Sequence, residues 1–172
     1  PLLYKNIGAD GIKTGFLTVE KYSLASSIKF GDRRINAVAS GFKTKNSRSR
    51  ESVKMLTWAL RSFDTIQVAK KNEVIASLDV WLGKKNKVEA FVQEDVYLTV
   101  PKRKKKIIKA FIEYNTPIEA PIAKGDKLGS LNIYVAGDLK KKIDVLSGEA
   151  IKKANIFLRL LKSFNFLVWG NV

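Results

Sequence analysis

The chain has 172 residues, of which 45% are hydrophobic, and it carries a formal net charge of +16. This length predicts one or two globular domains, and the charge favours an anionic partner such as a membrane surface or a nucleic acid. The absence of cysteine and histidine excludes disulfides, thiol chemistry and the commonest general base and zinc ligand, so we expect no metal and no cofactor.

The first region, residues 1–63, shows strand patterns that are followed by a helix pattern. Strands are predicted at residues 11–17, 22–28 and 34–40, and a helix opens at residues 47–51. Its apolar positions recur at helical spacing, namely Val53, Leu56, Leu60 and Phe63, with Met55 and Ala59 widening the same face. This order predicts the last strands and the closing helix of a larger α/β domain.

A three-residue motif, Lys13-Thr14-Gly15, lies in the first of these strands. It resembles the third active-site motif of the penicillin-binding and serine β-lactamase superfamily, in which a lysine supplies positive charge beside a nucleophilic serine. In that motif a threonine hydroxyl holds a substrate carboxylate, and a glycine lets the ligand lie against the strand without a Cβ between them.

The resemblance extends along nearly the whole chain and is closest to one branch of that superfamily, the low-molecular-weight D-alanyl-D-alanine carboxypeptidases. The matching phrases of the first region are Gly8-Ala9-Asp10-Gly11-Ile12-Lys13-Thr14-Gly15, then residues 22–27, 34–41, 48–51 and 54–63. Further on, the matching phrases are Val80-Trp81-Leu82-Gly83, residues 95–101 and Leu128-Gly129.

The motif order of this family is Ser-x-x-Lys, Ser-x-Asn and then Lys-Thr-Gly, so the resemblance implies that the first two motifs lie upstream of residue 1. Three internal segments spell the same letters, namely 26–29, 130–132 and 163–165. The first lies in a strand pattern, and the other two follow Lys-Thr-Gly in the chain. We therefore reject them and expect this chain alone to be inactive.

The second region, residues 64–147, consists of short β-branched runs that are separated by turn signals. Strands are predicted at residues 65–69, 74–81, 87–92, 96–100, 107–114 and 127–135. This pattern predicts a small all-β domain, a sandwich, with no catalytic constellation. The fold class is therefore the α/β end of a β-lactamase/transpeptidase-like domain, followed by a β-sandwich domain and a C-terminal amphipathic helix.

Two basic runs contribute to the net charge, at residues 102–106 and 140–142. Either a nucleic acid or an anionic membrane surface could bind such runs. The chain has no aromatic-interleaved ribonucleoprotein motif, zinc finger or helix-turn-helix signature. We therefore expect a membrane partner and no nucleic acid, with residues 102–106 forming a solvated loop.

The third region, residues 148–172, is predicted to form a helix over residues 149–169. Its apolar face contains Phe157, Leu161 and Phe164, and a basic face contains Lys152, Arg159 and Lys162. No charge-free apolar run is long enough to span a bilayer, so this pattern indicates an interfacial membrane anchor. The alternative is a helix packed on its own domain.

The resemblance implies a role for each matching residue. Lys13 provides positive potential and assists proton movement, and the backbone N–H of Phe16 forms half of an oxyanion hole. Thr14, Gly15 and Arg48 bind the terminal carboxylate end of a peptidoglycan pentapeptide, and β-lactams acylate the same serine. The implied location is the periplasm or outer face of the cytoplasmic membrane.

Two other classes remain open from the residues themselves. A β-lactamase relative would share Lys-Thr-Gly, although we would not expect it to carry the β-domain and the anchor helix. A basic membrane-surface or nucleic-acid binding module without catalysis would need none of residues 8–15.

Overall fold

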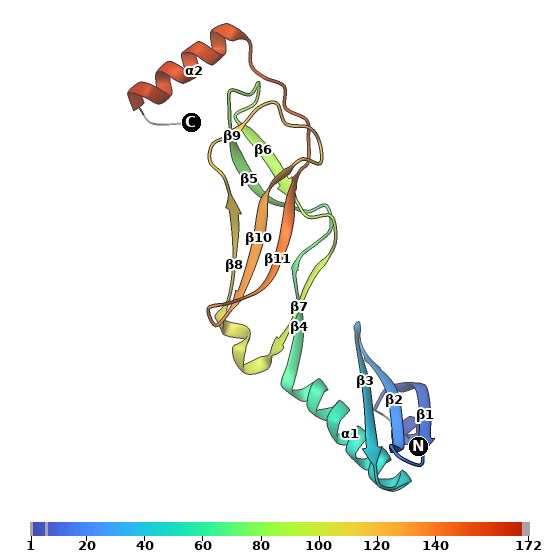
Figure 1. The fold of residues 1–172 in the computed structure, drawn as a ribbon. Coiled ribbons are helices and arrows are strands. Elements are labelled where there is room, and N and C mark those ends of the chain that lie inside the picture. Colours follow the sequence, from blue (N-terminus) through green and yellow to red (C-terminus); the bar gives the residue numbers. More distant parts are fainter. Residues whose placement is uncertain (1, 6, 170–172) are drawn as a thin grey trace. The chain divides into compact units, whose positions relative to one another are not determined.

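The computed structural model describes residues 2–5 and 7–169. The chain forms two compact units (Figure 1). Unit 1 comprises residues 1–65 and 99–102, and unit 2 comprises residues 66–98 and 103–172.

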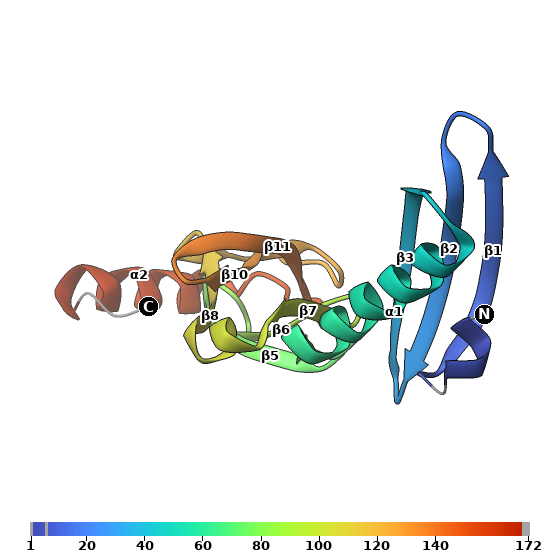
Figure 2. The ribbon, with the colours of Figure 1, turned by 90° about the horizontal axis from the view of Figure 1, so that it is seen from below.

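Unit 1 is a three-stranded antiparallel sheet with a helix along one face (Figures 1 and 2). A short 3-10 helix, η1 (Leu2–Lys5), precedes the strands β1 (Ala9–Leu17), β2 (Lys21–Phe30) and β3 (Arg33–Phe42), which are followed by helix α1 (Lys45–Ser62). The strand order is β1-β2-β3, so β1 and β3 are its two edge strands. These three strands and the helix agree with the predicted elements, and a complete α/β catalytic domain is not present in this chain.

The core of unit 1 forms where α1 packs on the middle strand. Leu24 and Ile28 of β2 and Leu56 of α1 are buried, and Val53 and Leu60 pack against them. These helix residues are the apolar positions that the sequence pattern identified. Because strand side chains alternate between faces, the other face of the sheet carries the intervening residues of β2.

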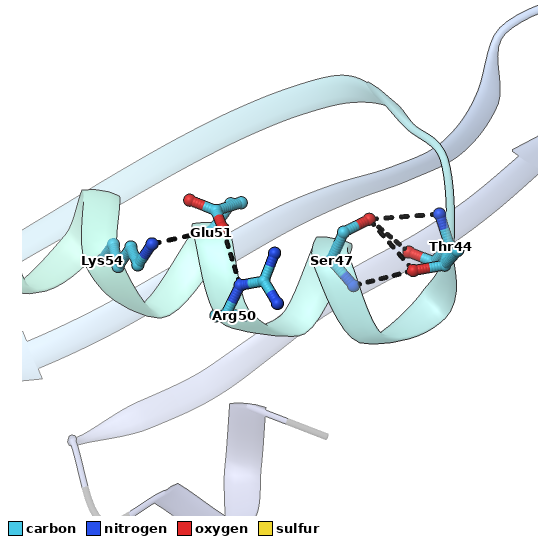
Figure 3. A network of polar contacts seen from close by, with 5 residues as sticks. All are labelled: Thr44, Ser47, Arg50, Glu51 and Lys54. Atoms are coloured by element: carbon cyan, nitrogen blue, oxygen red, sulfur yellow. Dashed lines mark hydrogen bonds and ion pairs between the residues drawn. The ribbon is translucent and has the colours of Figure 1, made fainter.

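Helix α1 begins at a capping box, which Figure 3 shows together with an adjacent charge network. The Thr44 hydroxyl accepts a hydrogen bond from the Ser47 backbone N–H at 3.0 Å, and the Ser47 hydroxyl accepts one from the Thr44 backbone N–H at 3.1 Å. One turn later, Glu51 pairs with Arg50 and Lys54. Two hydrogen bonds lower the pKa of Glu51: the one from Arg50 has the larger effect, and the one from Lys54 has the smaller effect.

An arginine on β3 joins all three strands of the sheet. The two terminal nitrogens of Arg34 lie 2.9 and 2.7 Å from the two carboxylate oxygens of Asp10 on β1. Arg34 also donates to the Ser27 hydroxyl of β2 at 2.6 Å. The hydrogen bond from Arg34 lowers the pKa of Asp10. This bidentate pair ties β1 to β3 three residues before the Lys-Thr-Gly motif begins.

Unit 2 is an all-β, sandwich-like domain that ends in a helix, as predicted. The strands that lie wholly or partly in unit 2 are β4 (Phe63–Ala69), β5 (Val74–Trp81), β6 (Lys87–Phe91), β7 (Val96–Pro101), β8 (Ile108–Tyr114), β9 (Ile118–Glu119), β10 (Lys127–Val135) and β11 (Asp138–Ser147). β4 pairs with β7, and the other strands form a sheet in the order β8-β10-β11-β6-β5-β9. Buried side chains alternate along these strands, as in Val88 and Ala90 of β6 and Val96, Leu98 and Val100 of β7.

Three elements of unit 2, the short strand β9, the strand β11 and the 3-10 helix η2, differ from the sequence prediction, as does the start of α2. Residues 138–147 form β11, a strand that we did not predict, because the lysines at 140–142 hide its pattern and only its last three residues are buried. The basic run expected to be a loop forms the exposed 3-10 helix η2 (Lys102–Ile107).

The predicted helix over residues 149–169 is wrong in its first part, because α2 spans only Ile156–Trp169. Ile151 and Ile122 exchange two backbone hydrogen bonds of 2.8 and 2.9 Å, and the Ala154 N–H donates to the Leu82 carbonyl at 2.8 Å. Ile151 and Ala154 are buried by this pairing. Asn155 then starts the helix, since its Oδ1 accepts a hydrogen bond from the Leu158 N–H at 2.9 Å.

Candidate functional site

The Lys-Thr-Gly motif lies on β1, an edge strand of the sheet in unit 1. Thr14 is opposite the buried Leu24 of β2, so its side chain lies on the face that packs against α1. Lys13 is opposite Ala25 and extends from the other face. Both residues are exposed, and Lys13 makes no ion pair with another described residue.

A hollow of about 660 Å³ lies between this strand and the beginning of α1. Lys13 and Thr14 line it from β1, and Arg48, Lys45 and Ser49 line it from α1. The structure therefore brings together three residues that the sequence analysis assigned to one site. The cationic side chains of Arg48 and Lys45 and the N-terminal end of a helix give this hollow a positive potential, which favours an anionic group such as a carboxylate.

Arg48 is held beside the motif strand by an aromatic residue. Its guanidinium carbon lies 5.6 Å from the centroid of the Tyr22 ring, and the Tyr22 ring lies 4.7 Å from that of Phe16. An arginine over an aromatic face is stabilised by the ring quadrupole. Tyr22 is thus a neighbour of Arg48 at this hollow that our sequence reasoning missed. The available signal was the pair of aromatic residues on either side of the predicted turn.

Gly15 and Phe16 are the other two residues of β1 that the sequence analysis assigned to the site. A Cβ at position 15 would fall 2.5 Å from the Ser23 hydroxyl, so Gly15 lets β1 and β2 approach without rotation of that serine. The Phe16 side chain is half exposed and contacts the Tyr22 ring at a tilt of 45°. Its position keeps the backbone of residue 16 next to the motif on the edge strand.

The three rejected serine motifs lie in the kinds of element that their sequence patterns predicted. Ser26 lies in β2, is almost fully buried, and donates its hydroxyl hydrogen bond to the Ala37 carbonyl at 3.2 Å. Ser130 lies in strand β10, and Ser163 lies in helix α2. The strand and helix predicted for these segments are confirmed, and no group of three metal-ligating side chains occurs among the described residues.

A second candidate site is the apolar surface of α2 in unit 2. Phe157 is 79% exposed and Phe164 is 64% exposed, and Leu161 is exposed beside them. Within residues 2–5 and 7–169, no helix is long and apolar enough to cross a membrane. The predicted basic face is rearranged, because Lys152 lies outside the helix and Lys162 turns toward its own domain.

Lys162 attaches α2 to the turn between β5 and β6. Its ammonium group donates to the Gly83 carbonyl at 2.9 Å and to Asn86 Oδ1 at 2.7 Å. Arg159, one turn earlier, is partly buried. These contacts leave the apolar side chains of α2 exposed, and Figure 1 shows the helix beside this end of unit 2.

Comparison with known proteins assigns the family. Residues 63–153, more than half of the chain, match the family described as "Penicillin-binding protein 5, C-terminal domain". The chain belongs to this family. The resemblance to low-molecular-weight penicillin-binding proteins is thereby confirmed, and the β-domain with its C-terminal helix is the fold of the penicillin-binding protein 5 C-terminal domain.

Curated relatives of this penicillin-binding protein 5 family member carry the name D-alanyl-D-alanine carboxypeptidase. DacA of Escherichia coli strain K12 is 32% identical over 93% of this chain and 40% of its own length. DacF of Bacillus subtilis is 33% identical over 90% of this chain and 40% of its own length. The chain therefore spans about two fifths of the curated relatives that it matches.

Solved structures agree with this family membership. Penicillin-binding protein 5 from Haemophilus influenzae superimposes with a TM-score of 0.78 and 28% identity, over 87% of this chain and 44% of that one. The carboxypeptidase DacD from Francisella tularensis gives a TM-score of 0.69 and 29% identity, over 89% of this chain and 38% of that one.

Proposed function

We propose that this chain is part of a serine-type D-alanyl-D-alanine carboxypeptidase that trims the terminal D-alanine from peptidoglycan pentapeptides. One observation carries the proposal: Lys13, Thr14 and Arg48 line a single positive hollow in a chain of the penicillin-binding protein 5 family. In this proposal residues 1–63 are the end of a transpeptidase-like domain, 64–147 the β-domain and 148–172 the anchor.

The substrate is a peptide that ends in a carboxylate. The Thr14 hydroxyl and the Arg48 guanidinium bind that carboxylate, with Gly15 next to Thr14 on the strand. Tyr22 holds Arg48 in place through its ring face. Binding at two points fixes the scissile amide relative to the strand, which is the positioning contribution to catalysis.

The reaction itself requires a serine from a Ser-x-x-Lys motif that this chain does not carry in a suitable place. That serine attacks the carbonyl carbon between the two D-alanines, the D-alanine amine leaves, and water hydrolyses the acyl-enzyme. Lys13 stabilises negative charge and assists proton movement, and the Phe16 backbone N–H donates to the developing oxyanion. β-Lactams acylate the same serine.

Labelling with a fluorescent penicillin tests this proposal in a protein that carries this chain together with the Ser-x-x-Lys and Ser-x-Asn motifs. Lys13→Ala should lower the acylation rate by roughly a hundred-fold to a thousand-fold, the loss seen when one oxyanion-stabilising donor is removed. Lys21→Ala, in the neighbouring strand, is the matched control. An unchanged rate in Lys13→Ala would overturn the assignment.

The chain alone provides the complementary test. The 172-residue protein should neither release D-alanine from a pentapeptide nor form a covalent adduct with penicillin. Mass spectrometry that located an adduct on Ser26 would contradict our rejection of that serine.

A second proposed function is the attachment of the chain, through α2, to the outer face of the cytoplasmic membrane. The exposure of Phe157, Leu161 and Phe164 on one helix supports it, because burying such side chains in a headgroup region is favourable. Lys152 would add attraction to anionic lipids. Lys162 contributes by attaching the helix to its own domain, Arg159 lies one turn before it, and we propose no nucleic-acid partner.

A further inference from the structure

A hollow of about 600 Å³ lies on the outward face of strands β8 and β10 in unit 2. Phe111 of β8 is directly opposite Asn132 of β10, and Lys109 is opposite Tyr134. Glu113, two residues after Phe111, completes the same face. This face is distinct from the core face of the same strands, which carries the buried Leu131 and Ile133 on β10.

Two aromatic rings form one wall of the hollow. The rings of Phe111 and Tyr134 are 6.1 Å apart and meet edge to face, at 63°. Phe111 is 55% exposed although it lies mid-strand. An exposed aromatic ring in a hollow offers a flat apolar surface, and the tyrosine adds a hydroxyl at its edge.

A buried amide forms the floor of the hollow. Asn132 is only 5% exposed, and its Nδ2 donates to Glu113 Oε2 at 2.6 Å. Its Oδ1 has no hydrogen-bond partner among the described residues. A buried acceptor without a donor is costly and rare in folded proteins, so this oxygen indicates a missing donor.

The charges of the hollow offset one another. Lys109 and Glu113 both line it, and Glu113 also lies 3.9 Å from Lys142 of the neighbouring strand β11. Glu113 thereby offsets part of the positive charge, so the hollow has less positive potential than the Lys-Thr-Gly site. Its lining favours an uncharged ligand that has an apolar face and several hydrogen-bonding groups.

We propose that this hollow binds a sugar ring of a saccharide chain. The C–H face of a pyranose would stack on Phe111, a ring hydroxyl or an acetamido N–H would donate to Asn132 Oδ1, and Glu113 and Lys109 would bind outer hydroxyls. Because Oδ1 is covered in the free protein, the Glu113 side chain, which is 69% exposed, would turn aside on binding. This proposal does not rest on the carboxypeptidase proposal.

Calorimetric titration of the 172-residue chain with the tetrasaccharide of N-acetylglucosamine tests the site. We expect saturable binding that Phe111→Ala weakens by about ten-fold or more, because the variant loses the stacking surface. Tyr97→Ala is the matched control, since Tyr97 is a similarly exposed aromatic residue of unit 2 outside the hollow. Its affinity should stay within about two-fold of the original.

Two more variants distinguish binding in this hollow from binding elsewhere on the chain. Asn132→Leu removes the buried acceptor and should fold as well as the original protein, yet lose binding by about ten-fold. Thr14→Ala, in the Lys-Thr-Gly site, should bind the tetrasaccharide unchanged. Absence of binding, binding that survives both Phe111→Ala and Asn132→Leu, or binding that Thr14→Ala abolishes would each overturn the proposal. Unchanged binding in Thr14→Ala leaves the carboxypeptidase proposal untouched.

Discussion

The ammonium group of Lys162 in α2 lies 2.7 Å from Oδ1 of Asn86, in the turn between β5 and β6. The same group donates to the Gly83 carbonyl, so one lysine makes both described side-chain hydrogen bonds between the helix and this turn. The ammonium group of Lys162 is thereby turned away from the apolar side chains of α2. The alternative of a helix docked on its own domain and the anchor proposal are compatible, because different sides of the helix serve each.

The attachment of α2 should depend on this lysine. Lys162→Met keeps the length of the side chain but removes its donors, and we expect faster backbone amide exchange over residues 156–169, equivalent to a loss of about 1 kcal/mol. Asn86→Ala should give a smaller effect in the same segment. Lys152→Met, which removes an exposed charge outside the helix, is the control, and equal effects of Lys152→Met and Lys162→Met would contradict the attachment.

The apolar face of α2 should bind lipid. Phe164→Glu places a charge among exposed apolar side chains, and we expect it to abolish co-sedimentation with vesicles that contain anionic phospholipid. Phe30→Glu, a similarly exposed residue of unit 1, is the matched control. Binding that persists after removal of residues 149–172 would show that α2 is not the anchor.

Arg48 should act on substrates that end in a carboxylate. In a protein that carries the upstream motifs, Arg48→Ala should raise KM for a D-alanyl-D-alanine peptide by about ten-fold, and it should affect a peptide amide much less. Arg50→Ala is the control, because Arg50 pairs with Glu51 and does not line the hollow. Equal losses for the acid and the amide would remove Arg48 from carboxylate binding.

The pair of Asp10 and Arg34 should stabilise unit 1 in a pH-dependent way. Because the pKa of Asp10 is lowered in the folded protein, its stabilising contribution is complete above the ordinary carboxyl pKa of about 3.9 and is lost as the pH falls through the lower folded value. Asp10→Asn should therefore lower Tm at pH 7 and have little effect near pH 2. Asp32→Asn, in the turn after β2, is the control, and equal Tm losses at both pH values would contradict this account.

The capping box should set the stability of α1. Thr44→Ala removes the acceptor for the Ser47 N–H and should cost about 1 kcal/mol in the free energy of unfolding, measured with urea. Thr44→Ser retains a hydroxyl and should cost less. Thr18→Ala, in the turn between β1 and β2, should be nearly neutral, and a similar loss there would show that the cap is not the cause.

The sequence predicted most of the strands, because their hydrophobic periods are clear. The predicted bounds of β5 and β10 are those observed, since alternation and turn residues delimit both strands. β11 was missed because three consecutive lysines occupy exposed positions that a pattern search takes for a loop. These lysines are exposed because β11 pairs with strands far away in the sequence, and the local pattern of hydrophobic residues does not reveal such pairing.

The start of α2 was misplaced for a related reason. Ala150 and Ala154 fit the helical spacing of Phe157, yet Ile151 and Ala154 gain more by pairing with residues far away in the chain. The motif residues Lys13 and Thr14 were found from sequence because three adjacent letters carry the signal. Tyr22 and Asn132 were not, since their surroundings arise only when neighbouring strands align.

The hairpin of β1 and β2 and the first turn of α1 are separated by a single further strand, so the hollow at Lys13 and Arg48 is built from contacts that are short in sequence. Contacts between residues that are near one another in the sequence form quickly, because closing the short loop between them costs little conformational entropy. During synthesis, this part of the molecule can assemble as soon as α1 has left the ribosome, before most of the β-domain has been made. Of the two units in this chain, the one that holds the positive hollow would then be the first to become structured.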